Sequence, residues 1–127
     1  MTTVGDIMST ELVAVSPTST VAEAATVMGE RHVGSALVME GDALLGIFTE
    51  RDIVRALSQD FDAPGHPLSH WMTTNPLTID PDASVEEALS RMLAGGFRHL
   101  PVVDGGSTLG VISMRDISRA QAERSGA

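Results

Sequence analysis

Two segments of the chain carry apolar residues at helical spacing, each directly after a hydroxyl residue. Thr20 and Ser84 precede these segments. Glu23 lies three positions after Thr20, and Glu87 lies three positions after Ser84. This is the sequence of a capping box, in which the hydroxyl accepts from an unpaired N–H and the glutamate reaches back. The pattern predicts two amphipathic helices that face a core. Their apolar stripes are Val21, Ala24, Ala25 and Met28, and Val85, Ala88, Leu89 and Met92.

Short apolar runs around these helices predict β-strands. Residues 13–15 and 77–79 favour strands and end at Pro17 and Pro81. Two later runs each enter a glycine-containing turn and return, which is typical of a hairpin. Thr49 and Ser113 then begin a second helix in each half. The hairpin strands are expected at 36–39 with 44–48 and at 100–103 with 109–112; short helical lead-ins are expected at 4–8 and 68–72.

The chain is a tandem repeat. A shift of 64 positions lays Gly46 to Ile53 on Gly110 to Ile117 without a gap. We therefore predict an α+β fold of two β-α-β-β-α repeats, packed as one pseudo-twofold module with paired clefts. The expected organisation is repeat 1 at residues 1–59, an exposed linker at 60–67, which is rich in Asp, Pro and Gly, and repeat 2 at residues 68–127.

Composition narrows the functional class. A chain of 127 residues with 43% hydrophobic content can bury roughly two thirds of its unfolded surface. It has no apolar run near the ~18 residues of a membrane span and no secretion signal, so we expect a cytoplasmic protein without a membrane partner. A net charge of −9 disfavours nucleic acid as a partner. The absence of cysteine excludes disulfides and thiolate nucleophiles.

Each repeat contains Gly-x-x-Ser/Thr-x-x-Asp at a predicted strand-to-helix junction. The residues are Gly46, Thr49 and Asp52, and then Gly110, Ser113 and Asp116. A hydroxyl and a carboxylate at this spacing resemble a capping box, which alone stabilises a helix by about 1 kcal/mol. The same geometry suits a nucleotide, because helix amides attract phosphate and a carboxylate accepts from vicinal ribose hydroxyls. Both interpretations remain open from the residues alone.

The two motifs and the segment Leu100-Pro101-Val102-Val103-Asp104-Gly105 resemble a tandem CBS-domain protein, or Bateman module, of the stand-alone two-CBS type. The resemblance covers nearly the whole chain. It implies a sensor for AMP, ADP, ATP or S-adenosylmethionine. It also implies that Asp52 and Asp116 hold ribose hydroxyls and that Thr49 and Ser113 approach phosphate. By the same resemblance, Val13 and Leu77 are candidate walls for the adenine base.

The repeats differ where the resemblance places a phosphate-contacting basic pair. Repeat 2 has Arg98 and His99, whereas repeat 1 has Gly34 and Ser35 at these positions. We hypothesise that a polyphosphate binds near Arg98 and His99 and that the other cleft is empty or weaker. The alternative is that both side chains are solvated, or bonded to backbone, at a turn leading into a strand. Repeat 1 also has Leu37 where the family commonly has proline.

No catalytic motif is found, and we expect no enzymatic activity. The chain has no Gly-x-Ser-x-Gly elbow, P-loop or His-Glu-x-x-His string, and it has no lysine. His66 and His70 are separated by Pro67 and lack metal-ligand spacing, so no metal site is expected. The leading hypothesis is a regulatory adenine-nucleotide sensor that acts on an unknown effector protein in trans. The alternative is a ligand-free dimerisation module whose motifs are only helix caps. The CBS resemblance also implies a homodimer, with Val54, Ala56 and Leu57 offering apolar surface.

Overall fold

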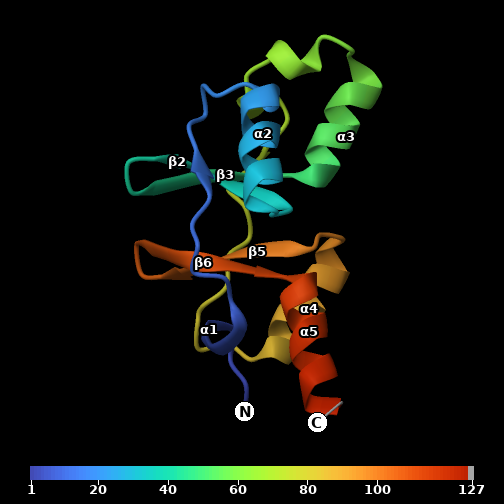
Figure 1. Ribbon diagram of the computed structural model, residues 1–127. Helices are drawn as coiled ribbons and strands as arrows, with labels where there is room; N and C mark the ends of the chain where they lie inside the picture. Colours follow the sequence, from blue (N-terminus) through green and yellow to red (C-terminus); the bar gives the residue numbers. More distant parts are fainter. Residues whose placement is uncertain (126–127) are drawn as a thin grey trace. The chain divides into compact units, whose positions relative to one another are not determined.

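The computed structural model describes residues 1–125 and shows two compact units (Figure 1). The first-repeat unit is Val13–Pro76. The second-repeat unit combines Met1–Leu12 with the chain from Leu77 onward. Both units contain helices and strands, so the predicted α+β class with two repeats is confirmed.

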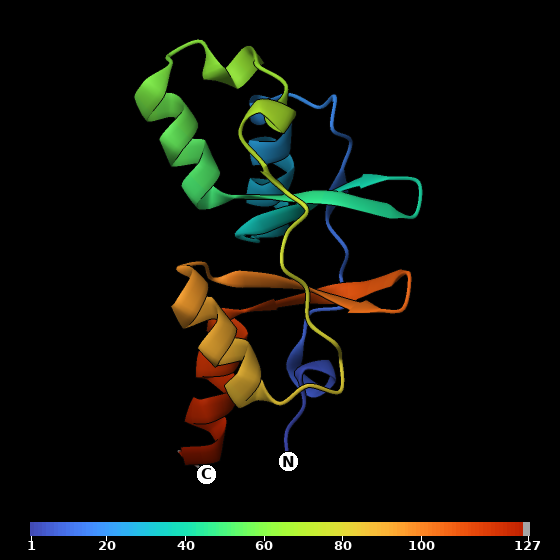
Figure 2. The same cartoon turned by 180° about the vertical axis from the view of Figure 1, so that it is seen from behind.

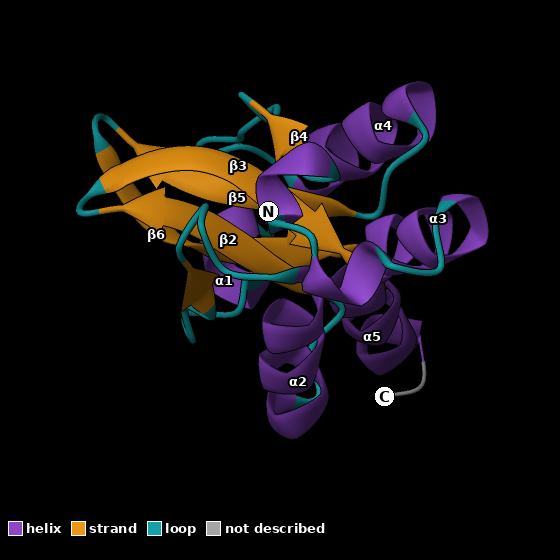
Figure 3. Cartoon of the chain, turned by 90° about the horizontal axis from the view of Figure 1, so that it is seen from above, coloured by secondary structure: helices purple, strands orange, loops and turns teal. Residues whose placement is uncertain are grey.

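The first-repeat unit is a four-stranded sheet with helices. The strand order is β1-β2-β3-β4; β1 runs parallel to β2, and the other pairs are antiparallel. Figure 3 shows the β2–β3 hairpin with its turn at one end and α3 at the other. The elements are β1 (Ala14–Val15), α2 (Val21–Arg31), β2 (Ser35–Glu40), β3 (Ala43–Thr49), α3 (Glu50–Gln59), the 3₁₀ turns η1 (Ala63–Gly65) and η2 (Leu68–His70), and β4 (Thr73–Thr74).

The second-repeat unit has the same plan with a smaller sheet. Its strands β5 and β6 form an antiparallel hairpin, with Leu100 opposite Ile112. Ile79 adds one parallel bridge to Val102. The elements are α1 (Val4–Ile7), α4 (Val85–Gly95), β5 (His99–Asp104), β6 (Ser107–Ser113) and α5 (Met114–Ser125).

Each helical stripe covers the core of its own unit, as predicted. Val21, Ala24 and Met28 are buried in a cluster with Phe48 and Leu68. The equivalent stripe of α4 is buried with Leu100, Val102, Ile112 and Ile117. Ala25 and Leu89 are half-buried. The apolar residues of each hairpin and of the helix before it therefore form one core per unit.

The lead-in segment of each repeat packs in the unit of the other repeat. Val4, from the start of the chain, is fully buried in the core of the second-repeat unit, and its N–H donates to the Ala83 carbonyl at 2.8 Å. Conversely, Leu68 is buried in the first-repeat unit, and β4 pairs with β3 there (Figure 2). The boundaries of the sequence repeats therefore differ from those of the compact units, because each unit contains the lead-in segment of the other repeat.

Two local predictions are wrong, and the prediction of an exposed linker holds only in part. Residues 77–79 form a single bridge rather than a strand, since Pro76 and Pro81 confine the extended segment. The linker at 60–67 is exposed at most positions, as expected, but Asp60 Oδ1 accepts from the Asp62 N–H, and the turn buries Ala63 completely. At α4, the Ser84 hydroxyl accepts from the Glu87 N–H, but the Glu87 carboxylate pairs with Arg91 at 2.8 Å instead of completing a capping box.

Candidate functional site

The motif hydroxyls lie at the junctions that the sequence predicts. Thr49 is the last residue of β3 and the N-cap of α3, and Ser113 is the last residue of β6, directly before α5. In both helices the third residue is the motif aspartate. Strand and helix therefore place a hydroxyl and a carboxylate side by side in each unit.

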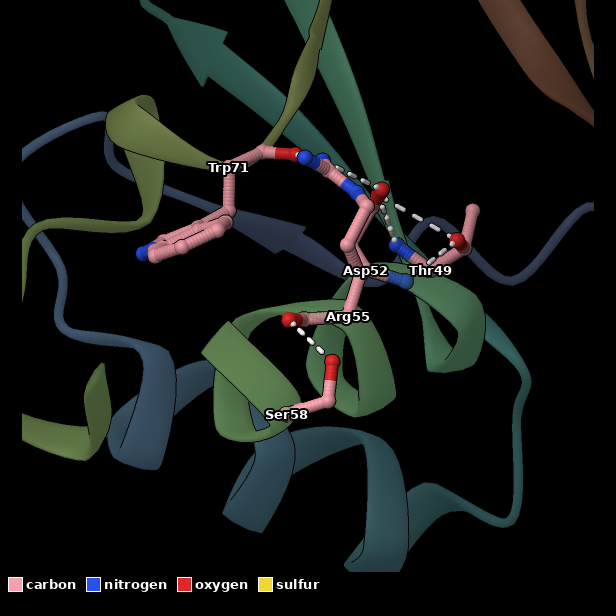
Figure 4. A network of polar contacts seen from close by, with 5 residues as sticks. All are labelled: Thr49, Asp52, Arg55, Ser58 and Trp71. Atoms are coloured by element: carbon pink, nitrogen blue, oxygen red, sulfur yellow. Dashed lines mark hydrogen bonds and ion pairs between the residues drawn. The ribbon is translucent and has the colours of Figure 1, made fainter. Parts of the chain in front are cut away.

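Asp52 is the more enclosed of the two carboxylates. Its side chain is only 10% exposed. Oδ2 accepts from the Thr49 N–H at 2.9 Å and from the Thr49 hydroxyl at 3.2 Å, while Oδ1 accepts from the Arg55 guanidinium at 3.2 Å (Figure 4). The Asp52 N–H donates to the Thr49 hydroxyl at 3.3 Å. This carboxylate both completes a capping box and forms an ion pair.

Asp116 makes fewer contacts. Its Oδ2 accepts from the Ser113 N–H at 2.8 Å, and its own N–H donates to the Ser113 hydroxyl at 3.1 Å. Within residues 1–125, no donor reaches Oδ1. Asp116 thus caps its helix through Oδ2, and within residues 1–125 its Oδ1 remains available as a hydrogen-bond acceptor.

Arg55 owes its position to Trp71. The guanidinium donates to the Trp71 carbonyl at 2.6 Å and lies 5.4 Å from the centre of the indole ring. Trp71 packs against the core of the first-repeat unit, and the His66 ring stacks on it with 7° between planes and 6.5 Å between centroids. Figure 4 shows the Arg55 guanidinium between the Trp71 carbonyl and Asp52. Sequence analysis missed both Arg55 and Trp71 as parts of the motif's surroundings.

The motif glycines make room for the chain itself. A Cβ on Gly46 would lie 2.7 Å from the Thr73 carbonyl oxygen, and a Cβ on Gly110 would overlap the Ser9 carbonyl oxygen. The exchanged lead-in segments thus cross directly over these strands. Both glycines therefore permit close approach of another backbone segment.

The amides at the two helix starts are partly used by the chain. The first N–H of α3 donates to the Gly34 carbonyl at 3.1 Å, and the first N–H of α5 donates to the Arg98 carbonyl at 2.9 Å. The third N–H of each helix is bound by the motif hydroxyl. An anion at either helix start therefore depends on side chains more than the sequence suggests.

Arg98 and His99 lie next to the second motif. His99 is directly opposite Ser113 in the β5–β6 register, and Arg98 precedes it with an exposed side chain. In the first-repeat unit the residue opposite Thr49 is Ser35, which is buried. The basic pair thus adjoins Ser113 of the second motif, and no basic residue stands at the matching positions of the first.

The two candidate base walls differ. Val13 is only 7% exposed, and its carbonyl accepts from the Leu37 N–H at 2.8 Å within the first-repeat unit. Leu77 is 60% exposed and belongs to the second-repeat unit. An exposed apolar side chain is available to an adenine ring, whereas a core side chain is largely covered.

The described residues contain neither a membrane-spanning helix nor a cluster of metal-ligating side chains. None of the helices within residues 1–125 is both long and apolar enough to cross a membrane. In the same part of the chain, no three His, Cys, Asp or Glu side chains gather in a group that could hold a metal ion.

Comparison with known sequences finds a clear family match. The profile of the family described as "CBS domain" matches residues 4–59 and 68–123. The chain is 41% identical to an uncharacterized 17.7 kDa protein of Acidianus ambivalens, over 94% of this chain and 73% of that protein. It is 35% identical to the CBS domain-containing protein YhcV of Bacillus subtilis, over 93% of this chain and 84% of that protein.

Solved structures match over the full length of the fold. The CBS-domain protein ATU1752 of Agrobacterium tumefaciens superposes with a TM-score of 0.89 at 31% identity, over 94% of this chain and 98% of that one. The CBS domain pair of MJ0100, solved with 5′-methylthioadenosine and S-adenosylmethionine, gives 0.87 at 27% identity, over 96% and 97%. CBSX2 in complex with AMP gives 0.82 at 27% identity, over 97% and 98%.

Proposed function

Because this chain belongs to the CBS-domain family and carries two CBS domains in tandem, we propose that it is a regulatory sensor that binds an adenosine-containing ligand through its second repeat. Two proteins of the same fold are solved with such ligands, namely AMP, 5′-methylthioadenosine and S-adenosylmethionine. The observation that carries the proposal is that Asp116 Oδ1 accepts no hydrogen bond within residues 1–125, in a motif whose Ser113 lies opposite His99.

The Asp116 carboxylate has the capacity to hold a ribose. An ionised carboxylate offers about four acceptor sites, and within residues 1–125 only one is used, by the Ser113 N–H. The two vicinal hydroxyls of a ribose need two acceptors. Hydrogen bonds to a charged acceptor stabilise by about 1.5–3 kcal/mol each, so the sugar would contribute a large part of the affinity.

The phosphate of a nucleotide would lie toward Arg98 and His99. His99 faces Ser113 across the hairpin, and the Arg98 side chain is exposed. A guanidinium suits bidentate contact with phosphate, and the Ser113 hydroxyl can add a donor. Leu77, exposed in the same unit, would supply apolar surface to the base. The candidate ligands are AMP, ADP, ATP and S-adenosylmethionine.

The proposed output is a change in the populations of conformations, which a separate effector protein detects. A ligand shifts such populations only by its differential affinity for them.

We further propose that the protein is cytoplasmic, where these ligands are abundant, and that it forms a homodimer through α3, whose Val54 and Leu57 are 67% and 48% exposed. Ala56, also considered from the sequence, is completely buried and offers no surface.

A thermal-shift screen of the four ligands tests the proposal. At about 100 times its dissociation constant, a ligand stabilises the folded protein by ~2.7 kcal/mol, which raises the melting temperature. Asp116→Asn should abolish this increase, because asparagine keeps an oxygen for the Ser113 N–H but has lost the carboxylate. Asp52→Asn is the matched control and should keep the increase. No shift with any of the four ligands, or a full shift in Asp116→Asn, would contradict the proposal.

A further inference from the structure

We infer that Arg55, held by Trp71, closes the first repeat to adenosine ligands by occupying Asp52. The inference rests on the proposed function, since it concerns the same ligand class, and it explains why only one repeat would bind. It assigns a specificity-determining role to two residues outside the Gly-x-x-Ser/Thr-x-x-Asp motif.

The Asp52 carboxylate has almost no acceptor capacity left. Three of its roughly four acceptor sites are filled, by the Thr49 N–H, the Thr49 hydroxyl and the Arg55 guanidinium. A ribose diol needs two. The side chain is also only 10% exposed, so a sugar would have to displace Arg55 before reaching Oδ1.

Trp71 makes that displacement costly. The Arg55 guanidinium is bonded to the Trp71 carbonyl at 2.6 Å as well as to Asp52, and it lies over the indole ring. An exposed ion pair alone contributes little, but here the guanidinium also makes a cation–π contact with the indole ring and a charge-assisted hydrogen bond to the carbonyl. Trp71 itself is fixed, because its backbone N–H donates to the carbonyl of buried Leu68 at 2.9 Å and its side chain packs on the core.

The second repeat has the arginine but lacks the tryptophan. Arg119 occupies the position equivalent to Arg55, three residues after Asp116. The residue equivalent to Trp71 is Ile7. The Arg119 guanidinium makes no hydrogen bond or ion pair within residues 1–125, and Asp116 keeps its free oxygen. The closure therefore depends on Arg55 and Trp71 together rather than on an arginine at this position.

Calorimetric titration with AMP tests the inference. The wild-type chain should bind one AMP per chain. Arg55→Met, which keeps most of the aliphatic stem but removes the donors, should bind two. Arg119→Met is the matched control in the second repeat and should still bind one. Arg55→Ala, at an exposed helix position, is a second variant should methionine disturb folding, which circular dichroism would report.

Assignment of the gained site uses double variants. Asp52→Asn in the Arg55→Met background should remove the gained site and leave one. Asp116→Asn in that background should leave one site as well, now the one in the first repeat.

Each outcome separates the inference from the proposed function. Two sites in the wild type, or one site in both Arg55→Met and Arg55→Ala, overturns the inference while the proposed function stands. No binding by the wild type but one site in Arg55→Met overturns the proposed function and supports the closure. No binding by any of these proteins overturns both.

Discussion

At the scale of single residues, the two motif aspartates differ because of what surrounds them. Both have an arginine three residues later, Arg55 or Arg119, and both cap a helix. The sequence therefore predicted the two carboxylates and their hydroxyls but gave no reason to separate them by this arginine. Only the packing of Trp71 against the first core shows that one arginine is held on its carboxylate. In contrast, the alignment of the repeats already shows that Arg98 and His99 have no basic counterparts in repeat 1.

The motif glycines give the first stability prediction. Gly110→Ala should destabilise the fold by ~1–3 kcal/mol, because the new methyl group would overlap the Ser9 carbonyl oxygen, which is backbone and cannot rotate away. Gly106→Ala, in the turn of the same hairpin, is the control, since a Cβ there has nothing within 4 Å. Urea denaturation would measure both. Equal midpoints for the two variants would show that the lead-in segment does not cross β6 closely.

At the scale of elements, the exchanged lead-ins are the feature that sequence analysis missed. The stripes of α2 and α4 and both hairpins were predictable, because their hydrophobic periods are local. The places where 1–12 and 68–76 pack were not, since the repeat aligns each lead-in with its own copy and nothing local records the exchange. For the same reason β4 was not predicted: two threonines pair with β3 only because the chain returns there.

Val4 tests the exchange. Val4→Ala should lower the free energy of unfolding by about 2 kcal/mol, because the side chain is fully buried and two methyl groups are lost. Hydrogen exchange should then quicken at the Val111 N–H, which donates to Ser9 at 3.0 Å, more than at the Leu37 N–H of the first-repeat unit. Equal acceleration at Val111 and Leu37 would argue against packing of the first residues on the second repeat.

The capping box of α2 gives a pH prediction. Hydrogen bonds from the Thr20 N–H, and then from its hydroxyl, lower the pKa of Glu23 below its usual value. The carboxylate therefore contributes stability that is fully present above the unfolded pKa near 4.5 and is lost as the pH falls through the lower folded pKa. Thr20→Ala removes the hydroxyl but keeps the backbone N–H, so nuclear magnetic resonance titration should show the Glu23 pKa rise only partway toward its ordinary value. An unchanged Glu23 pKa in that variant would contradict the contribution of the Thr20 hydroxyl.

At the scale of the whole molecule, the exposed apolar residues of α3 bear on assembly. Val54 and Leu57 are solvent-exposed in the single chain, and Phe61, just after the helix, is 86% exposed. The double variant Val54→Asp, Leu57→Asp should sediment as a monomer in sedimentation velocity, because formation of the proposed homodimer would bury two charges per chain. Ala43→Asp, at an exposed apolar position of the β2–β3 hairpin, is the control and should remain dimeric. A wild-type monomer at all concentrations would remove the dimer proposal.

The central claim is that Asp116 receives the ribose hydroxyls of an adenosine ligand. Its most direct test is the affinity of wild type and Asp116→Asn for AMP and for 2′,3′-dideoxy-AMP, which lacks both hydroxyls. With two bonds to a charged acceptor of ~1.5–3 kcal/mol each, the wild type should prefer AMP by roughly a hundredfold or more, and Asp116→Asn should lose most of that preference. Equal affinity of the wild type for the two ligands, or an unchanged preference in Asp116→Asn, would contradict the claim.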